Sequence, residues 1–266
     1  MKNSMSRART NGVLALLLAA GAAGCASVSE QRGMAPVASL AGERLGQQAR
    51  LLRGDSDHAA LARLIDERLK SPLQADDAVQ IALLNNRALQ AVYWDAGIAE
   101  AELVQAGRLR NPVFDFERTV AVGGGGLEIE RSLIFNLASI LTMPLAQRIE
   151  RSRYEQTTLQ VAERMLQHAA ATRTAYIEAV AAEQSKHYAL QVQTAAEASA
   201  ALTERMAQVG NVSRLDLARE QVFRAETAAG LARAGQRALA AREALTRAMG
   251  LVGTAATAYT LPQRLP

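Results

Sequence analysis

Acidic side chains recur at alternate positions within residues 113–136, and they are the groups in this sequence best placed to act on an ion. Apolar and polar residues alternate there with a period of two, in two arms separated by four glycines that begin at Gly123, which predicts a β-hairpin. Acids that share a strand face attract cations where that face lines a water-filled lumen, whereas on a soluble hairpin they face only solvent. The predicted lumen-facing acids are Asp115, Glu117, Glu128 and Glu130.

Catalytic chemistry and metal binding have no candidate residues in this sequence. Its three histidines are His58, His168 and His187, and the last two are 19 residues apart in one predicted helix. A helix rises 1.5 Å per residue, so these two side chains are about 28 Å apart and cannot share a metal ion. The four glycines join two strands and precede no helix, unlike a phosphate-binding loop. We therefore predict a protein that is not an enzyme, that binds no metal and that uses no cofactor.

The single cysteine, Cys25, follows a predicted export signal. Residues 1–24 contain three basic residues and no acid, and they end in an apolar run that is shorter than the roughly 20 residues of a membrane-spanning helix. The run closes on Ala22-Ala23-Gly24-Cys25, which resembles the lipobox of bacterial lipoproteins, with Ala22 where leucine is usual. The resemblance implies that Cys25 is diacylated and that the protein is held at the outer membrane, since Ala26 rather than Asp follows it. The alternative is a free cysteine, buried or incidental.

The charge of the chain does not indicate a nucleic-acid partner. The 266 residues carry a formal net charge of +4, and removing the three basic residues of the export signal leaves +1. In the predicted helices basic residues such as Arg148 and Arg151 are interleaved with acids such as Glu150, as on a solvated helix face. We therefore expect no nucleic acid among the partners.

Long helices account for most of the chain. Alanine supplies 55 of the 266 residues, which favours helices that approach one another closely. A period near 3.6 predicts a helix over 75–107, and residues 145–208 contain neither Pro nor Gly, which predicts a helix about 96 Å long. Ser213 and Asp216 match a capping box that opens a returning helix over 213–249. Residues 25–72 are predicted to form an arm with a short helix, and the segment after residue 249 an extended tail.

The expected fold is mainly α: a long antiparallel helical hairpin, as in an α-barrel segment or coiled coil, with a two-stranded β-hairpin over 113–136. Each arm of the β-hairpin has about ten residues, which matches the length of a tilted strand that crosses a bilayer. A lone hairpin leaves its edges unpaired in hydrocarbon. We therefore expect it to contribute to an oligomeric transmembrane β-barrel or to remain outside the membrane.

The order of these elements resembles one repeat of the TolC-type outer-membrane efflux proteins, also called outer membrane factors, and is closest to the heavy-metal efflux branch. The similarity covers about residues 40–266, and each fragment alone is weak. The residues that carry it are Asp77-Ala78, Ala82-Leu83, Asn86, Leu89, the run from Gly97 to Leu103, Ala106-Gly107, Asn111-Pro112, Met143-Pro144-Leu145, Tyr176, Val209-Gly210, Ser213, Leu215-Asp216 and Met249-Gly250.

The resemblance implies a passive export conduit for metal cations or small toxic compounds, lipid-anchored in the outer membrane and extending into the periplasm. Its implied partners are further copies of the chain, outer-membrane lipid, a periplasmic adaptor protein and an inner-membrane efflux pump. The adaptor would contact the tip of the helical hairpin, where Asn211 replaces the small apolar residue that is common in the family. This predicted tip comprises Val209, Gly210, Asn211, Val212 and Ser213.

Residues 73–266 correspond to a single repeat, whereas members of that family carry two. The chain is then either a truncated half or a native half-length subunit, and it would form a trimer-like or a hexameric assembly. A second function fits the missing repeat: a periplasmic coiled-coil structural lipoprotein without channel activity, whose β-hairpin never enters the membrane.

Overall fold

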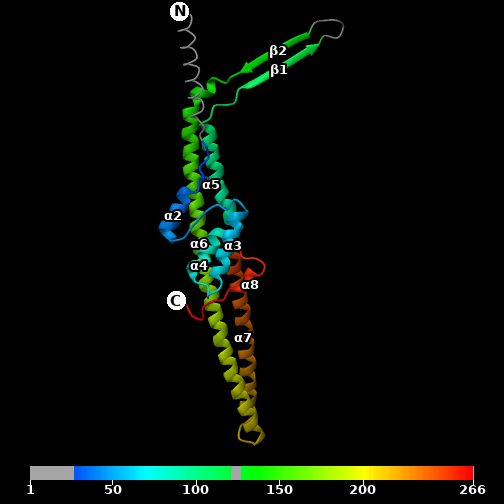
Figure 1. The fold of residues 1–266 in the computed structure, drawn as a ribbon. Coiled ribbons are helices and arrows are strands. Elements are labelled where there is room, and N and C mark those ends of the chain that lie inside the picture. The colour runs from blue at the N-terminus through cyan, green and yellow to red at the C-terminus, as the bar shows by residue number, and fades with distance from the viewer. Residues whose placement is uncertain (1–26, 121–126, 266) are drawn as a thin grey trace, which may run out of the picture. The chain divides into compact units, whose positions relative to one another are not determined.

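A computed structural model of the chain describes residues 27–120 and 127–265 (Figure 1). Its described part is mainly helical and contains one antiparallel two-stranded hairpin, which confirms the predicted fold class. None of the helices in these two ranges combines the length and apolar character needed to cross a membrane. The elements are α2 (Ala35–Leu45), α3 (Asp55–Arg68), α4 (Ala75–Asn85), α5 (Arg87–Ala106), β1 (Val113–Val120), β2 (Leu127–Ile134), α6 (Ala138–Gln208), α7 (Arg214–Met249) and α8 (Ala255–Ala258).

The chain divides into two compact units, each built from two separate segments. Within the described residues, the hairpin unit comprises 27–33 and 96–158, and the core unit comprises 34–95 and 159–265. The predicted arm over 25–72 contributes residues 34–72 to the core unit, together with the returning helix, and the predicted repeat over 73–266 contributes residues to both units.

The core unit is organised around α4, which is buried on nearly every side. Residues 78–84 are all buried, as expected for a helix surrounded by others rather than lying on a surface. Its apolar side chains meet residues of α3, α6 and α7 in one cluster. The hydroxyl of Tyr176 in this cluster donates to the carbonyl of Leu73 (3.0 Å), and the N–H of Leu73 donates to the carbonyl of Thr260 (2.9 Å).

Both ends of the core unit are more ordered than the sequence indicated. The predicted arm contains two helices, α2 and α3, and Leu61 and Ile65 of α3 are buried in the core cluster. The predicted extended tail includes the short helix α8, and Tyr259 directly after it is buried. The periodic pattern in these segments is too short to stand out locally, and packing in the core unit stabilises them.

The predicted helix 75–107 is divided at Asn86, which separates α4 from α5. Asn86 adopts an extended backbone conformation, and its side-chain oxygen accepts from the N–H of Leu89 (3.1 Å) as the N-cap of α5. The amide groups of Asn85 and Asn86 donate to carbonyls at the end of α7: Asn85 to Met249 (3.0 Å) and Gly250 (2.8 Å), Asn86 to Ala248 (3.1 Å). The break therefore satisfies carbonyls that a helix end leaves without partners.

Helix α6 is one continuous helix of 71 residues and begins at Ala138, seven residues before the predicted start at 145. Asn136 caps it by accepting from the N–H of Ser139 (3.1 Å). Pro144 lies inside the helix, where it has no N–H to donate to the carbonyl of Ile140 and its ring crowds that carbonyl. The N-cap and the apolar turn after it outweigh this lost bond, so the proline does not set the boundary.

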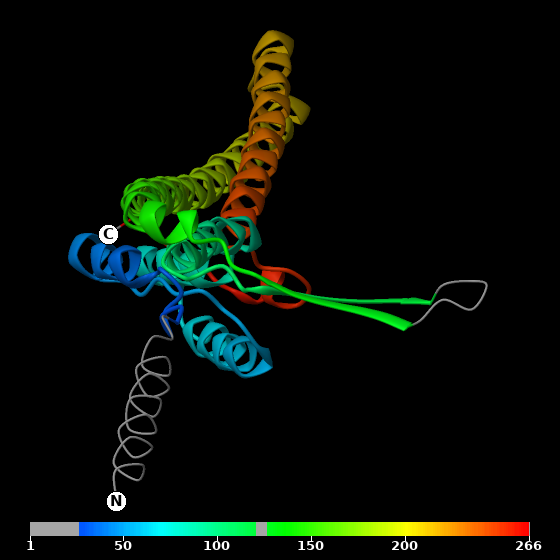
Figure 2. The same cartoon turned by 90° about the horizontal axis from the view of Figure 1, so that it is seen from above.

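Within the core unit α6 runs antiparallel to α7 (Figures 1 and 2). Ala196, Ala200, Ala234 and Ala238 are buried along the two helices, which explains the high alanine content by close helix approach. Polar bonds also cross the pair. Ser199 donates to Glu220 (3.1 Å), and Thr227 donates to Gln193 (2.5 Å).

The hairpin unit holds the N-terminal described residues against α5. The N–H of Ser29 donates to Glu100 (3.1 Å), and Tyr154 donates to the carbonyl of Gly33 (3.3 Å). Gly33 has φ +74°, and a Cβ there would lie 2.4 Å from the carbonyl oxygen of Ala96. Only glycine fits this position. Residues 27–33 thus pack closely against α5 at Ala96 and Glu100.

The β-hairpin extends from the ends of α5 and α6 as a ribbon of two strands (Figure 2). Strands β1 and β2 are antiparallel over eight residues each, somewhat shorter than the predicted ten, with Phe114 opposite Leu133 and Glu117 opposite Glu130. The sheet contains no third strand within the described residues.

Candidate functional site

The tip of the helical hairpin is a tight turn fixed by two caps. Gly210 has φ +78°, its N–H donates to Ala207 (3.1 Å), and the N–H of Asn211 donates to Met206 (2.9 Å), the bond pattern of a Schellman motif. Ser213 then caps α7 by accepting from the N–H of Asp216 (3.1 Å). The predicted tip residues 209–213 all lie in this turn.

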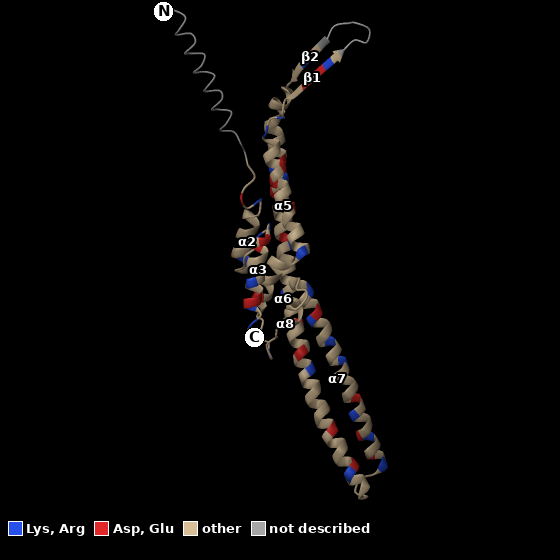
Figure 3. Ribbon diagram, turned by 45° about the vertical axis from the view of Figure 1, so that its right-hand side comes forward, with Lys and Arg blue, Asp and Glu red and all other residues tan. Residues whose placement is uncertain are grey.

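Exposed apolar side chains surround the turn. Val209 is 69% exposed and Leu215 is 60% exposed, on either side of Gly210. The charges nearby are mixed, as they are along the rest of α7 (Figure 3), and Arg219 lies 3.5 Å from Asp216. A rigid turn that presents apolar side chains within a polar rim is suited to contact with another protein.

The strand register places the predicted acids on one face of the β-hairpin. Opposite residues of an antiparallel pair point to the same side, and residues two apart do so as well. Asp115 lies opposite Ser132 and Glu117 opposite Glu130, and position 128 lies opposite Thr119 on that face. The direct Glu117–Glu130 pair is repulsive, which costs roughly 0.2–1 kcal/mol unless a cation or solvent offsets it.

The other face of the β-hairpin is apolar apart from two arginines. Phe114, Phe116, Ile129 and Leu133 are all exposed on it. Arg118 lies opposite Ile129 and Arg131 opposite Phe116, so that the two arginines are diagonal neighbours. The hairpin is therefore amphipathic, with an acidic side and an apolar side.

A small cationic cavity at the base of the β-hairpin was not anticipated from the sequence. It has a volume of about 270 Å³ and lies between the end of α5 and the start of α6. The hairpin separates the two lining segments by about thirty positions, so spacing alone gave no signal, although the Arg-Leu-Arg triplet at 108–110 was visible. The lining residues are Gln105, Ala106, Arg108, Arg110, Ser139, Thr142, Met143 and Ala146.

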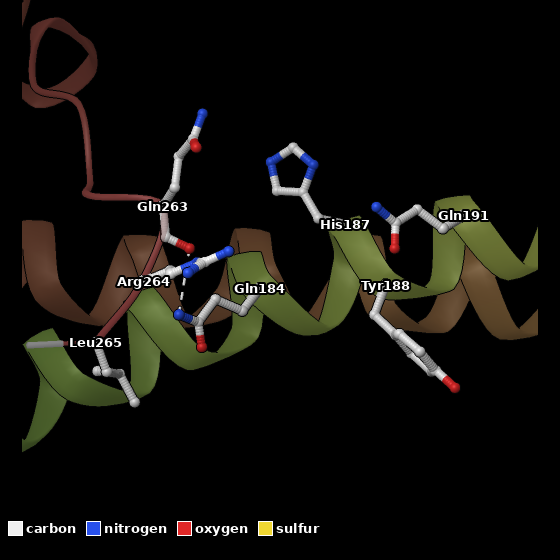
Figure 4. A pocket seen from close by; sticks show the side chains of 7 residues that line it. All are labelled: Gln184, His187, Tyr188, Gln191, Gln263, Arg264 and Leu265. Carbon is white, nitrogen blue, oxygen red and sulfur yellow. Dashed lines mark hydrogen bonds between the residues drawn. The ribbon is translucent and has the colours of Figure 1, made fainter.

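A larger cavity of about 620 Å³ lies between α6 and the C-terminal tail (Figure 4). Gln184 donates to the carbonyl of Gln263 across it (3.2 Å), and His187 stands on its rim. Among the described residues its lining contains no carboxylate, thiol or serine, and the carboxylate nearest to His187 is that of Glu183, 3.9 Å away and one turn earlier in α6. No group of three metal-ligating residues occurs within the described residues.

The other two histidines lie away from this cavity. The Nε2 atom of His168 lies 3.0 Å from the carbonyl oxygen of Ala248, which also accepts from the side chain of Asn86. Burial lowers the pKa of His168, and the bond to that carbonyl offsets part of the shift. His58 lines a cavity of about 390 Å³ with apolar residues such as Leu52 and with Trp94.

The export signal 1–24 and the predicted lipid-attachment residue Cys25 lie outside the described residues.

No protein-family model and no curated protein sequence matches the chain. Its fold is similar to the crystal structure of a membrane protein from Pseudomonas aeruginosa, with 20% identity and a TM-score of 0.55 over 78% of this chain and 48% of that one. It is also similar to CusC, in crystal structures concerned with folding and transmembrane channel formation, with 19% identity and a TM-score of 0.58 over 73% of this chain and 46% of that one. The chain thus spans about half the length of each. At this identity the likeness establishes the fold, with its long antiparallel helices and two-stranded hairpin.

Proposed function

We propose that this chain is a component of a TolC-type outer-membrane efflux conduit that passively exports metal cations or small toxic compounds. One observation carries the proposal: a β-hairpin with an acidic face and an apolar face is joined to a long antiparallel helical pair, in a fold similar to that of CusC, whose crystal structures concern transmembrane channel formation. The protein has no enzymatic role in this proposal.

The two faces of the β-hairpin have different tasks. Phe114, Phe116 and Leu133 turn toward lipid, and the acids turn toward the lumen, where they concentrate cations. Within the described residues both outer edges of the hairpin are without a partner strand, and further copies of the chain supply the neighbouring strands. The assembly is trimer-like or hexameric.

The helical tip contacts a periplasmic adaptor, which connects the conduit to an inner-membrane pump. Val209 and Leu215 supply the apolar contact surface, and the Gly210 turn holds it rigid. Acylation of Cys25 anchors the chain to the outer membrane, and residues 27–33 attach that anchor to α5.

Conductance in planar bilayers tests the proposal. The purified assembled chain should form cation-selective pores, and the Glu117→Gln/Glu130→Gln variant should show a several-fold lower preference for cations over anions. The matched control is Glu155→Gln/Glu226→Gln, which removes two exposed helical carboxylates instead.

Stable assemblies that never conduct would overturn the channel proposal. The structural-lipoprotein alternative would then be supported by protease cleavage within residues 113–136 in outer-membrane vesicles, because a hairpin in solution is accessible and one in a membrane is protected.

A further inference from the structure

The cavity at the base of the β-hairpin concentrates positive charge. Among the described residues, Arg108 and Arg110 line it, and no carboxylate does. Arg110 takes part in none of the ion pairs found between described residues. Two guanidinium groups beside a small cavity suit a phosphate, which guanidinium can bind through paired hydrogen bonds.

The hydroxyl groups of the cavity present oxygen atoms rather than protons. Ser139 donates its proton to the carbonyl of Asn136 (2.6 Å), and Thr142 donates to the carbonyl of Ala138 (3.2 Å). Each hydroxyl oxygen is left with a lone pair that can accept from a ligand hydroxyl. The cavity therefore combines cationic donors for a phosphate with neutral acceptors for an alcohol.

Apolar side chains flank these polar groups in the sequence. Leu109 stands between the two arginines and is 61% exposed, and Leu141, beside Thr142, is 84% exposed. Leu137 and Ile140 on the same turn are exposed as well. Isolated exposed apolar residues need no explanation, but four of them within the two segments that supply the cavity lining suit a ligand with a charged head and hydrocarbon tails.

We infer that this cavity binds the headgroup of an anionic phospholipid of the phosphatidylglycerol type, with its phosphate on Arg108 and Arg110 and its glycerol hydroxyls on Ser139 and Thr142. The acyl chains leave the cavity toward the exposed apolar side chains of the two segments that line it. A choline or ethanolamine headgroup fits less well, because its ammonium meets no carboxylate in the cavity. The inference rests on the proposed function, which puts the base of the hairpin at the membrane surface.

Native mass spectrometry of the purified full chain in a neutral detergent tests the site without requiring a membrane. Short-chain phosphatidylglycerol should bind at least several-fold more tightly than phosphatidylcholine of the same chain length. A basic residue near an anionic lipid surface contributes about fivefold in affinity, so Arg108→Gln/Arg110→Gln should weaken phosphatidylglycerol binding by roughly 25-fold. The matched control Arg148→Gln/Arg151→Gln removes two exposed arginines outside the cavity and should change binding less than twofold.

A charge-preserving variant separates binding from misfolding. Arg108→Lys/Arg110→Lys keeps both charges but loses the planar guanidinium, and it should bind phosphatidylglycerol with intermediate affinity. Equal binding of the two lipids by the wild type, or equal losses in the Gln variant and its control, overturns the inference. Displacement of the lipid by millimolar inorganic phosphate also overturns it, since the site would then recognise a free anion.

The two proposals fail separately. If the chain binds phosphatidylglycerol tightly but forms no pores, the lipid site is supported and the channel proposal is refuted. If the chain forms pores but binds both lipids equally, the channel proposal is supported and the lipid site is refuted.

Discussion

Replacing Gly250 by alanine tests whether the hydrogen bonds that Asn85 and Asn86 donate to the end of α7 stabilise the core unit. Gly250 has φ +69°, and an added Cβ would lie 2.9 Å from both the carbonyl oxygen of Asn85 and the Cα of Asn86. Both neighbours are backbone atoms, so this close contact can be relieved only if the α4–α5 junction moves. The movement would stretch the bonds that Asn85 donates to Met249 and Gly250.

The matched control is Gly253→Ala, because Gly253 has a similar φ of +62° but no atom within 4 Å of an added Cβ. The left-handed conformation alone costs an alanine roughly 1–2 kcal/mol, and this applies to both variants. Gly250→Ala should lose a further 1–2 kcal/mol or so, since two hydrogen bonds worth about 1 kcal/mol each are weakened. We therefore expect about 3 kcal/mol for Gly250→Ala and about 1–2 kcal/mol for Gly253→Ala.

Urea unfolding followed by circular dichroism measures the difference through the two midpoints. The comparison needs only the shift between variants at similar slope, which is safer for a chain of two units than an absolute free energy of unfolding. Equal midpoints for Gly250→Ala and Gly253→Ala would show that the bonds from Asn85 to the end of α7 do not contribute to stability.

Two further predictions concern His168 and Ser213. Burial lowers the folded-state pKa of His168 below its ordinary value of 6.5, so the unfolded chain binds a proton more readily; stability should be full above about pH 6.5 and decline as the pH falls from there toward the folded pKa. Replacement by Gln should flatten urea midpoints measured between pH 5 and 7, and an unchanged slope would contradict the role given to the buried ring. Ser213→Ala removes the acceptor for the N–H of Asp216 and should destabilise the first turn of α7 by about 1 kcal/mol, seen as about fivefold faster hydrogen exchange at residues 214–217 while residues near 240 are unaffected.

The parts of the fold that could be predicted are those set by local signals. The Gly210 turn and the Ser213 cap depend only on residues close together in the sequence, and the structure contains both. The period of two in 113–136 required the acids to share a face, because a one-residue slip would move every side chain to the other side. Whether that face lines a lumen depends on other copies of the chain and remains a proposal.

The parts that were missed depend on contacts between distant residues. Asn86 interrupts a good helical pattern without proline or glycine, and its amide reaches Ala248, 162 positions away. The predicted start of α6 lies seven residues too late, because proline disfavours a helix interior, whereas the N-cap at Asn136 lies before Pro144. The cationic cavity joins segments on either side of the β-hairpin, so its members become neighbours only after α5 and α6 pair.

Under the proposed function, the β-hairpin can enter the membrane only when the chain assembles with other copies, because the outer edges of the hairpin have no partner strand within the described residues. Each strand has eight residues, and about half of its backbone N–H and C=O groups point away from the partner strand. In water these groups bond to solvent, but in hydrocarbon each costs several kcal/mol without a partner. A single chain would pay that cost along both edges, whereas a closed ring of copies pairs every edge. The hairpin should therefore enter the membrane only together with other copies, and protection of residues 113–136 from protease should rise with chain concentration.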